Sequence, residues 1–376
     1  MSTANLFEFY NDNHSYISTI LSPTTTSRFL FGNFMPHVSR FAKFWNLSNK
    51  QVSKAKKQKK IFVLDSMYEG FSNLYYKPNL DEIYQNCELL SINPKQIILV
   101  TMNLVAHQNL KQYLQSHNAP KIQILSQSFG EYELYIRSQQ FKTTDVNIDL
   151  INTKKQFKKL CKNKILLNLN HRFKQPRSLL AFYLATSKIK DYCLVSHNQK
   201  YITEFDRDLI KRIDRSCKQE KRWSKNTPMI IDKKITTNFK LHQSTVFEVV
   251  GETLTGSWCG TSREYSEKTF RPIVNFQPFV IYGQKGCNHY LKNLGYKTYE
   301  DWFDLSFDFI DDDVERLLGL YKSVEEATIK LSKMTKCEQY DWRFKNEAVL
   351  KHNYENFFCN VQNIIRNTKS FFDRHM

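Results

Sequence analysis

The sequence predicts an α/β fold with two lobes. Short, continuous apolar segments recur along the chain, and polar stretches long enough for helices separate them. Such segments are typical of strands in a parallel sheet that is covered on both faces. With 376 residues, 41% of them hydrophobic and 14% aromatic, the chain is long enough for two cores and too apolar to be disordered over most of its length.

The strands can be placed in order. Three are expected in the first part of the chain: KIFVLDS after Lys59, QIILVTM after Lys95 and KIQILSQ after Pro120. We expect the aromatic side chains of residues 1 to about 50, which show weak periodicity, to pack onto the first lobe. The second part repeats the alternation with NKILLNL, DYCLVSH, PMIIDKK, TVFEVVG and PFVIYG, and charged helices then run to Met376.

The lysine-rich stretch 154–162 predicts the boundary between the lobes. We therefore expect an N-terminal α/β lobe over residues 1–158, a second α/β lobe over 159–310, and C-terminal helices over 311–376. The Asp311, Asp312 and Asp313 run is expected to open one of these helices, because acidic side chains favour the positive end of the helix dipole.

Composition excludes several classes of protein. Neither GxGxxG nor GxxxxGK[ST] occurs, which disfavours nicotinamide dehydrogenases and P-loop enzymes. The eight Cys show no CxxC and no Cys/His spacing of the zinc kind, so we expect no metal site and a reduced, cytoplasmic location. No signal-peptide pattern and no run of eighteen apolar residues is present, so neither secretion nor a membrane span is expected.

The chain carries a net charge of +18, which attracts polyanions such as nucleic acid, anionic lipid or phosphorylated glycan. One basic stretch runs from Arg207 to Lys225. Within it, five cationic residues three or four positions apart would follow one side of a helix: Arg207, Lys211, Arg215, Lys218 and Arg222. Such a stripe suits contact with a phosphate backbone, although a solvated helix face is the plainer interpretation.

The stretch YSEKTFRPIVNFQPFVIYG, residues 265–283, places an acid and a base next to each other just before an apolar strand. A helix is expected to begin near Tyr265 with Ser266 as its N-cap. Glu267, Lys268 and the amides of the first turn would then meet where an anion can bind. A strand ending at Gly283 follows, so this group lies at the edge of a βαβ-like unit, where open α/β sheets bind ligands.

The order of these motifs, "SEK-T-F-R-P-I", then "Q-P-F-V-I-Y-G", then "L-G-Y-K-T-Y", resembles the donor-binding half of a two-lobed (GT-B-like) glycosyltransferase family of bacteriophages and large viruses. It is similar, more distantly, to fucosyltransferases and exostosin-like transferases. The resemblance runs from about Asn163 to Arg316. It implies two Rossmann-like lobes, the first on the acceptor side and the second binding a nucleotide-sugar, with terminal helices that pack back on the first lobe. It also implies that Glu267 holds ribose or sugar hydroxyls and that Lys268 holds the diphosphate.

Other candidate site residues follow predicted strands. Asn170, Arg172 and Arg177 lie in NLNHRFKQPR, after NKILLNL, and the resemblance places a comparable "LN-x-R" stretch at the opening of its second lobe. A guanidinium there can hold a diphosphate through two parallel hydrogen bonds, and Arg172 is the first choice. Glu252 ends the strand VFEVVG and is expected to point toward the same crevice as Glu267.

Glycosyl transfer also needs a base for the acceptor hydroxyl if the anomeric centre is inverted. Glu69 and Asp65, in DSMYEG after the first strand, are the candidates, and Glu69 is preferred because Asp65 would also suit a helix cap. No DxD stands in a strand-to-loop setting, so a metal-independent mechanism is expected, with the nucleotide-diphosphate-sugar as co-substrate and no cofactor.

The sequence thus predicts a hexosyl- or pentosyltransferase that acts in the cytoplasm of a host cell, with (hydroxymethylated) duplex phage DNA as the first choice of acceptor. A glycan, a lipopolysaccharide or a viral protein is the alternative acceptor. A basic nucleic-acid-binding protein without enzymatic activity is the alternative of another class, and it would leave Glu252, Glu267 and Lys268 without a role.

Overall fold

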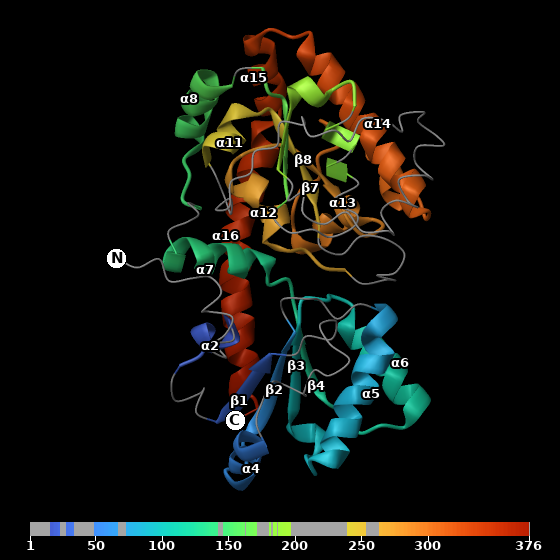
Figure 1. Ribbon diagram of the computed structural model, residues 1–376. Helices are drawn as coiled ribbons and strands as arrows, with labels where there is room; N and C mark the ends of the chain where they lie inside the picture. The colour runs from blue at the N-terminus through green and yellow to red at the C-terminus, as the bar shows by residue number, and fades with distance from the viewer. Residues whose placement is uncertain are drawn as a thin grey trace. The chain divides into compact units, whose positions relative to one another are not determined.

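The computed structural model describes residues 16–22, 28–33, 49–66, 73–141, 146–161, 163–170, 180–181, 183–185, 187–196, 239–252 and 263–375. These residues form two compact units (Figure 1). Unit 1 contains the described residues of Met1–Tyr132, Trp258–Tyr265 and Val361–Met376, and unit 2 those of Glu133–Ser257 and Ser266–Asn360.

Unit 1 is built on a four-stranded parallel sheet in the order β1-β2-β3-β4. Its strands are β1 (Phe29–Asn33), β2 (Ile61–Ser66), β3 (Ile97–Thr101) and β4 (Gln123–Ser126). Its helices are α2 (Tyr16–Ile20), α4 (Asn49–Lys57), α5 (Asn73–Leu89) and α6 (Ala106–His117). Because the strands pair in chain order and right-handed crossovers are the rule, the connecting helices are expected on one face of the sheet.

The core of unit 1 bears this out. Val52 of α4, Ile83 of α5 and Leu110 of α6 join one apolar cluster with alternate residues of the strands, among them Leu64 and Leu99. In Figure 1, α5 and α6 lie beside each other next to this sheet. The strands place apolar side chains on both faces, as parallel strands covered by helices do.

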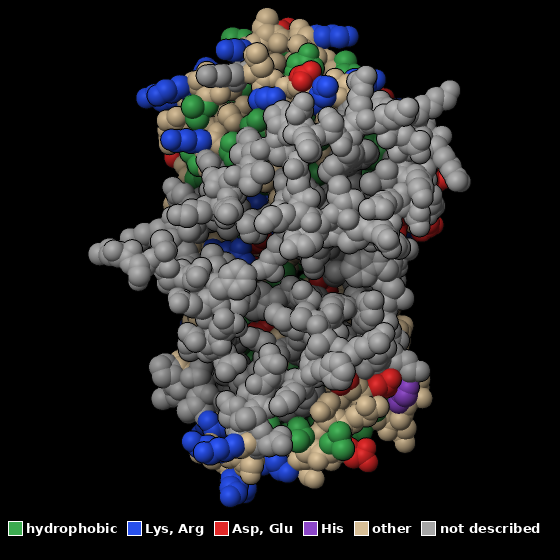
Figure 2. Space-filling model, in the orientation of Figure 1, with side chains coloured by type: hydrophobic (Ala, Val, Ile, Leu, Met, Phe, Trp, Pro, Cys, Tyr) green, Lys and Arg blue, Asp and Glu red, His purple; other side chains and the backbone are tan. Residues whose placement is uncertain are grey.

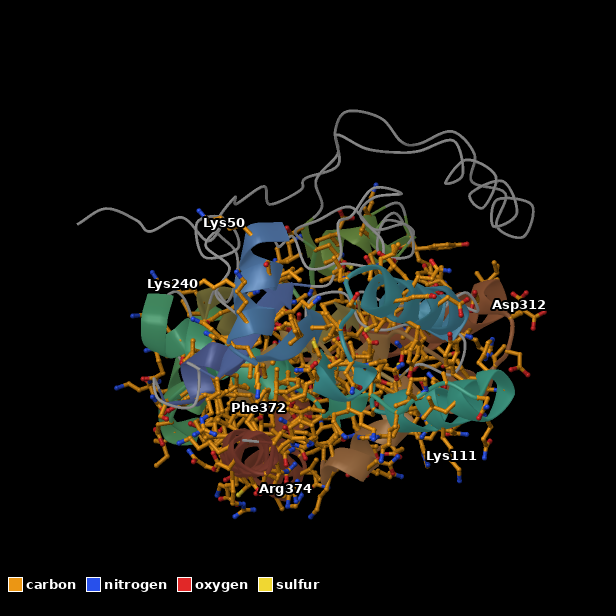
Figure 3. All side chains as sticks on the ribbon, turned by 90° about the horizontal axis from the view of Figure 1, so that it is seen from below. Lys50, Lys111, Lys240, Asp312, Phe372 and Arg374 are labelled. Carbon is orange, nitrogen blue, oxygen red and sulfur yellow. The ribbon has the colours of Figure 1, made fainter. Side chains whose placement is uncertain are left out.

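The end of α16 (Glu347–Asp373) belongs to unit 1. Gln127, directly after β4, donates its side-chain amide to the Thr368 hydroxyl of this helix at 2.7 Å. Phe372 points from the helix into the unit and is fully buried, whereas Arg374, just after the helix, points outward (Figure 3). The C-terminal segment is therefore an amphipathic cover for the first sheet.

Unit 2 holds a second four-stranded parallel sheet, in the order β6-β5-β7-β8. Its strands are β5 (Leu166–Leu169), β6 (Cys193–Ser196), β7 (Phe247–Gly251) and β8 (Phe279–Tyr282). The chain passes from β5 outward to β6 on one side, and from β7 outward to β8 on the other side. The sheet therefore has a topological switch point between the adjacent strands β5 and β7, where open α/β sheets bind their ligands.

Helices surround this second sheet. They are α8 (Leu150–Leu160), α11 (Phe239–Ser244), α12 (Glu267–Val274), α13 (Cys287–Tyr290), α14 (Asp313–Ser332), α15 (Lys336–Phe344) and most of α16. Helix α7 (Gly130–Phe141) begins in unit 1 and continues in unit 2 from Glu133. Two 3-10 turns precede β3 and β6, at Pro94–Gln96 and Lys190–Tyr192.

The predicted fold class, two Rossmann-like α/β lobes followed by C-terminal helices, is confirmed. Asp312 caps α14 by accepting from the amides of Val314 and Glu315, as the acidic run indicated. The sequence missed β1: the aromatic segment before residue 50 contributes a strand, because Phe29–Asn33 pairs with β2. The predicted strand PMIIDKK lies outside the described residues.

The division between the units falls at Tyr132 and Glu133, ahead of the boundary at 158 that the lysine-rich stretch indicated. The structure places α8 in unit 2 because Phe157 of this helix packs against the rings of Tyr340 and Phe344 in α15, with centroids 6.3 and 5.8 Å away. Lys155, Lys158 and Lys159 thus lie on the exposed side of a helix of unit 2. None of the helices in the described part of the chain is both long and apolar enough to span a membrane.

One buried cation ties three helices of unit 2 together. Arg343 of α15 is fully buried, and its guanidinium donates to the carbonyl oxygens of His242 and Thr245 at 2.8 and 2.7 Å. It also donates to the carbonyl oxygens of Asn275 and Phe276 at 3.0 and 3.4 Å. These carbonyls lie at the C-terminal ends of α11 and α12, where a cation satisfies helix-end acceptors and matches the helix dipole.

Arg343→Met should lower the stability of the protein by about 3–5 kcal/mol, because a similar apolar volume remains while several buried carbonyls lose their donor. Urea unfolding measures the change. Arg366→Met is the control: it removes an exposed arginine of α16 and should change stability by less than about 0.5 kcal/mol. Equal effects of the two substitutions would show that Arg343 has no special structural role.

Candidate functional site

The candidate site lies at the carboxyl edge of the second sheet. Two residues directly follow the central strands: Asn170 after β5 and Glu252 after β7. The pairing of β5 with β7 aligns Leu166 with Phe247, and continuing that register puts Asn170 beside the end of β7. Both residues are buried, at 2% and 3% exposed. The two predicted site residues thus both lie at the switch point.

Glu252 fixes the start of α12. One carboxylate oxygen accepts from the Ser266 amide at 3.2 Å and from the Thr269 hydroxyl at 2.5 Å, and the other accepts from the Ser266 hydroxyl at 2.7 Å. The Glu252 amide continues the ladder by donating to the Tyr282 carbonyl at 2.9 Å. Because hydrogen bonds to a carboxylate are roughly twice as strong as neutral ones, Glu252 holds the helix start firmly against β7.

The helix begins where the sequence predicted. Ser266 is its N-cap, with extended backbone, and its hydroxyl accepts from the Lys268 amide at 3.4 Å. Ser266 and Thr269 are three positions apart, so both reach Glu252 from the same face of α12. Glu267 and Lys268 are left on the partly exposed side, at 15% and 16% side-chain exposure. The first turn thus separates residues that anchor the helix to Glu252 from a charged, partly exposed pair.

Glu267 and Lys268 form an ion pair in the structure. The Lys268 ammonium donates to both oxygens of the Glu267 carboxylate, at 3.0 and 3.2 Å, and to the Ser266 hydroxyl at 3.2 Å. Although burial acts in the opposite direction, Lys268, Arg137 and Arg271 hold the pKa of Glu267 below its usual range. Glu267 is therefore an anion, and its two contacts hold the Lys268 side chain in place at the positive end of α12.

Two residues of α7 complete the group, and the sequence analysis missed both. Glu133 and Arg137 form an ion pair one helical turn apart, and Nη1 of Arg137 lies 3.8 Å from Oε1 of Glu267. Burial raises the pKa of Glu133. The carboxylates of Glu267 and Glu252 add to this rise, whereas the cations Arg137 and Lys268 act against it. The i, i+4 acid and base spacing in EYELYIR was the signal available in the sequence.

Side-chain amides link the neighbouring strands beside this group. Asn168 of β5 donates to the Val249 carbonyl of β7 at 2.7 Å, and Asn170 donates to the Asn168 side-chain oxygen at 2.5 Å. The backbone amide of Asn170 donates to the Ser196 carbonyl at 3.0 Å, which extends the hydrogen-bond ladder to β6. Oδ1 of Asn170 is buried and has no hydrogen-bond partner among the described residues. It is an acceptor at the switch point, where a ligand hydroxyl or amide would suit it.

The structure joins four of the predicted residues in one hydrogen-bonded group: Glu252, Ser266, Glu267 and Lys268. A fifth, Asn170, directly follows the neighbouring strand β5. Three others lie outside the described residues: Glu69, Arg172 and Arg177. The basic stripe from Arg207 to Lys225 lies outside them as well. Asp65 is the last residue but one of β2 in unit 1 and is 1% exposed.

No group of three or more His, Cys, Asp or Glu side chains that could hold a metal ion occurs in the parts of the chain that the structure describes. A shallow hollow along α16, between Gln362 and Arg374, is lined by none of the residues of the candidate site.

A buried polar network lies next to the candidate site, against the same strand. Glu248 of β7 is fully buried, with Oε2 3.3 Å from Nδ1 of His242 and Oε1 3.8 Å from Nη2 of Arg271. Nδ1 of His242 also lies 2.7 Å from the side-chain oxygen of Gln277, which makes Nδ1 the protonated nitrogen of a neutral ring. Burial lowers the pKa of His242 to about 3. Burial also raises the pKa of Glu248 to about 7, although the cation of Arg271 acts in the opposite direction.

Comparisons with known proteins add little. No model of a known protein family matches the chain, and no curated protein matches it. A crystal structure of a glycosyltransferase from Rickettsia africae is similar over 98% of this chain and 84% of that one, with 12% identity and a TM-score of 0.41. A likeness this low carries no information about activity.

The Glu248→Gln variant should gain stability relative to wild type as the pH rises. The folded-state pKa of Glu248, about 7, exceeds its ordinary value of 4.5, so the folded protein binds more protons between these values. The stability that the wild type gains from the protonated Glu248 side chain is therefore fully present below pH 4.5. It is lost as the pH rises to 7, by roughly 3 kcal/mol. Thermal melts of both proteins at pH 5 and pH 8 measure the change. A stability difference that is the same at both pH values would contradict the assignment.

Proposed function

We propose that the protein is a glycosyltransferase that moves a sugar from a nucleotide-diphosphate-sugar donor to an acceptor hydroxyl. The observation that carries the proposal is the first turn of α12, which Glu252 holds at the switch point of a parallel sheet with Lys268 and Glu267 beside it. Helix-start amides and an ammonium suit a diphosphate. A neighbouring carboxylate suits hydroxyl groups of a ribose or a sugar.

The chemistry follows from these charges. As the bond between the sugar carbon and the diphosphate breaks, negative charge grows on the departing phosphate and positive charge grows on the sugar ring. Lys268 and the dipole of α12 would stabilise the negative charge on the phosphate. Glu267 would orient the donor by accepting hydrogen bonds from the donor's hydroxyl groups. Asn170 would supply a further hydrogen bond. In this proposal the transferred sugar is a hexose or a pentose, and protein cations take the place of a metal ion.

Arg172 and Arg177 are proposed as further diphosphate ligands, on the resemblance of NLNHRFKQPR to the family motif. Glu69 and Asp65 are proposed as alternatives for the base of an inverting reaction. The burial of Asp65 favours Glu69, since a carboxylate that is 1% exposed cannot easily reach an acceptor hydroxyl.

For the acceptor we propose a polyanion, with duplex DNA as the first choice. The net charge of +18 supports this choice, and exposed lysines gather on two described helices, visible in blue near α4 and α8 in Figure 2. On α4 and just after it they are Lys50, Lys54, Lys56, Lys57 and Lys59, and on α8 they are Lys155, Lys158 and Lys159. A glycan, a lipopolysaccharide or a viral protein is the alternative acceptor.

Lys268→Ala and Arg172→Ala should each weaken the binding of a nucleoside diphosphate by at least tenfold, because each removes a charge-assisted contact worth about 1.5–3 kcal/mol. Calorimetric titration with uridine, guanosine, cytidine and adenosine diphosphates first identifies the base, and the variants are then compared with that ligand. Lys285→Ala is the control, since it removes the same charge from an exposed position of unit 2.

The control should bind as wild type does. Unchanged diphosphate affinity in both Lys268→Ala and Arg172→Ala would overturn the donor site. Failure of the wild-type protein to bind any of the four diphosphates would overturn the proposed activity as a whole.

If duplex DNA is the acceptor, its affinity for the protein should fall steeply with salt, because bound counterions are released on association. Changing Lys211, Arg215 and Lys218 together to Glu should flatten that dependence and impair transfer to DNA, while hydrolysis of the sugar nucleotide persists. Filter binding over a salt series tests this. No measurable affinity of the wild type at low salt would exclude DNA as the acceptor.

A further inference from the structure

Arg137 is placed in the candidate site by its own helix. Glu133, one turn earlier on α7, pairs with one terminal nitrogen of the guanidinium. The other terminal nitrogen, Nη1, faces the Glu267 carboxylate at 3.8 Å. Arg137 is 11% exposed at its side chain, so the group is not sealed from solvent. The guanidinium thus stands between a carboxylate of its own helix and the acid and base pair at the start of α12.

Two cations share the Glu267 carboxylate. Lys268 contacts it at hydrogen-bond distance, 3.0 Å, whereas Arg137 approaches only to ion-pair distance, 3.8 Å. The contact of Arg137 with Glu267 is therefore the looser of the two. A phosphate oxygen that arrived beside Lys268 would offer Arg137 a short, charge-assisted hydrogen bond in exchange for a long ionic contact.

We infer that Arg137 is a second cation of the donor site, and this inference rests on the function proposed above. On donor binding its guanidinium turns from Glu267 to the diphosphate, while Glu133 keeps hold of its other edge and acts as a positioning residue. The pair of Lys268 and Arg137 then grips the diphosphate from two helices. Glu267, relieved of one cation, is left to accept hydroxyl groups of the donor.

The position of Glu133 adds a consequence that can be measured. The charged groups that face it are Arg137 on its own helix, Glu267 and Lys268 at the start of α12, and Glu252 after β7. Its burial among these groups already raises its pKa. A bound diphosphate adds negative charge nearby, which favours the protonated acid further. Donor binding should therefore take up a fraction of a proton, up to one, and the affinity should fall as the pH rises.

Calorimetric titration of the full-length protein with the nucleoside diphosphate that it binds, and with the matching free nucleoside, tests the assignment. Arg137→Ala should lower diphosphate affinity roughly tenfold or more and leave nucleoside affinity unchanged. Arg137→Lys should fall between Arg137→Ala and wild type, since an ammonium keeps the charge without the fork of donors. Arg366→Ala, an exposed arginine of α16, is the matched control and should bind as wild type does.

Titrations at one pH in buffers of different ionisation enthalpy count the protons taken up. Wild type should take up more protons than Glu133→Gln, because the titration of the ligand phosphate is common to both proteins. The variant should keep its fold, because the amide preserves the shape of the side chain. If Arg137→Ala does not fold, the comparison of Arg137→Lys with wild type decides. If the wild type binds the diphosphate and the Arg137 variants bind it with the same affinity, this inference is overturned and the donor site at Lys268 stands. Absence of wild-type binding would overturn both.

Discussion

The position of α12 depends on two buried charges, one at each end of a helix of eight residues. At its start, Glu252 accepts three hydrogen bonds from Ser266 and Thr269. Just beyond its end, Arg343 donates to the carbonyls of Asn275 and Phe276. A helix this short has little stability of its own, so tertiary contacts must hold it. The anion and the cation complement the helix dipole as well as its unsatisfied amides and carbonyls.

This arrangement explains the order of residues in SEKT. Positions 266 and 269 carry hydroxyls that donate to the carboxylate just after β7, and positions 267 and 268 carry charges that pair with each other. The acid and base pair is therefore ordered without being used to hold the helix. Its neighbours on α7, Glu133 and Arg137, add one carboxylate and one cation, so that the group balances its own charge within a partly buried setting. An anionic ligand can compete for such cations, whereas a solvated surface pair would offer it little.

Local chemistry made much of this predictable. Strands β2, β3, β4, β7 and β8 are apolar segments bounded by polar residues. Ser266 has a hydroxyl that can cap a helix, which marks a helix start. The five candidate residues near α12 and β5 could be named from the sequence because they directly follow strands or open a helix. Residues that act through distant contacts were not. Arg343 looks like any arginine of a charged helix, and its carbonyl partners are about 70 to 100 positions away in the chain. Likewise β1 contains Gly32, which weakens a strand pattern, and it is recognisable only by its pairing with β2.

The central claim is that the start of α12 is an anion site for a nucleoside diphosphate. A crystal structure of the protein with its bound nucleoside diphosphate tests it most directly. The account predicts diphosphate oxygens within hydrogen-bond distance of the Lys268 ammonium and of the first-turn amides of α12, with the contacts between Glu252, Ser266 and Thr269 intact. A diphosphate bound elsewhere in the protein, with the Lys268 and Glu267 pair undisturbed, would contradict it.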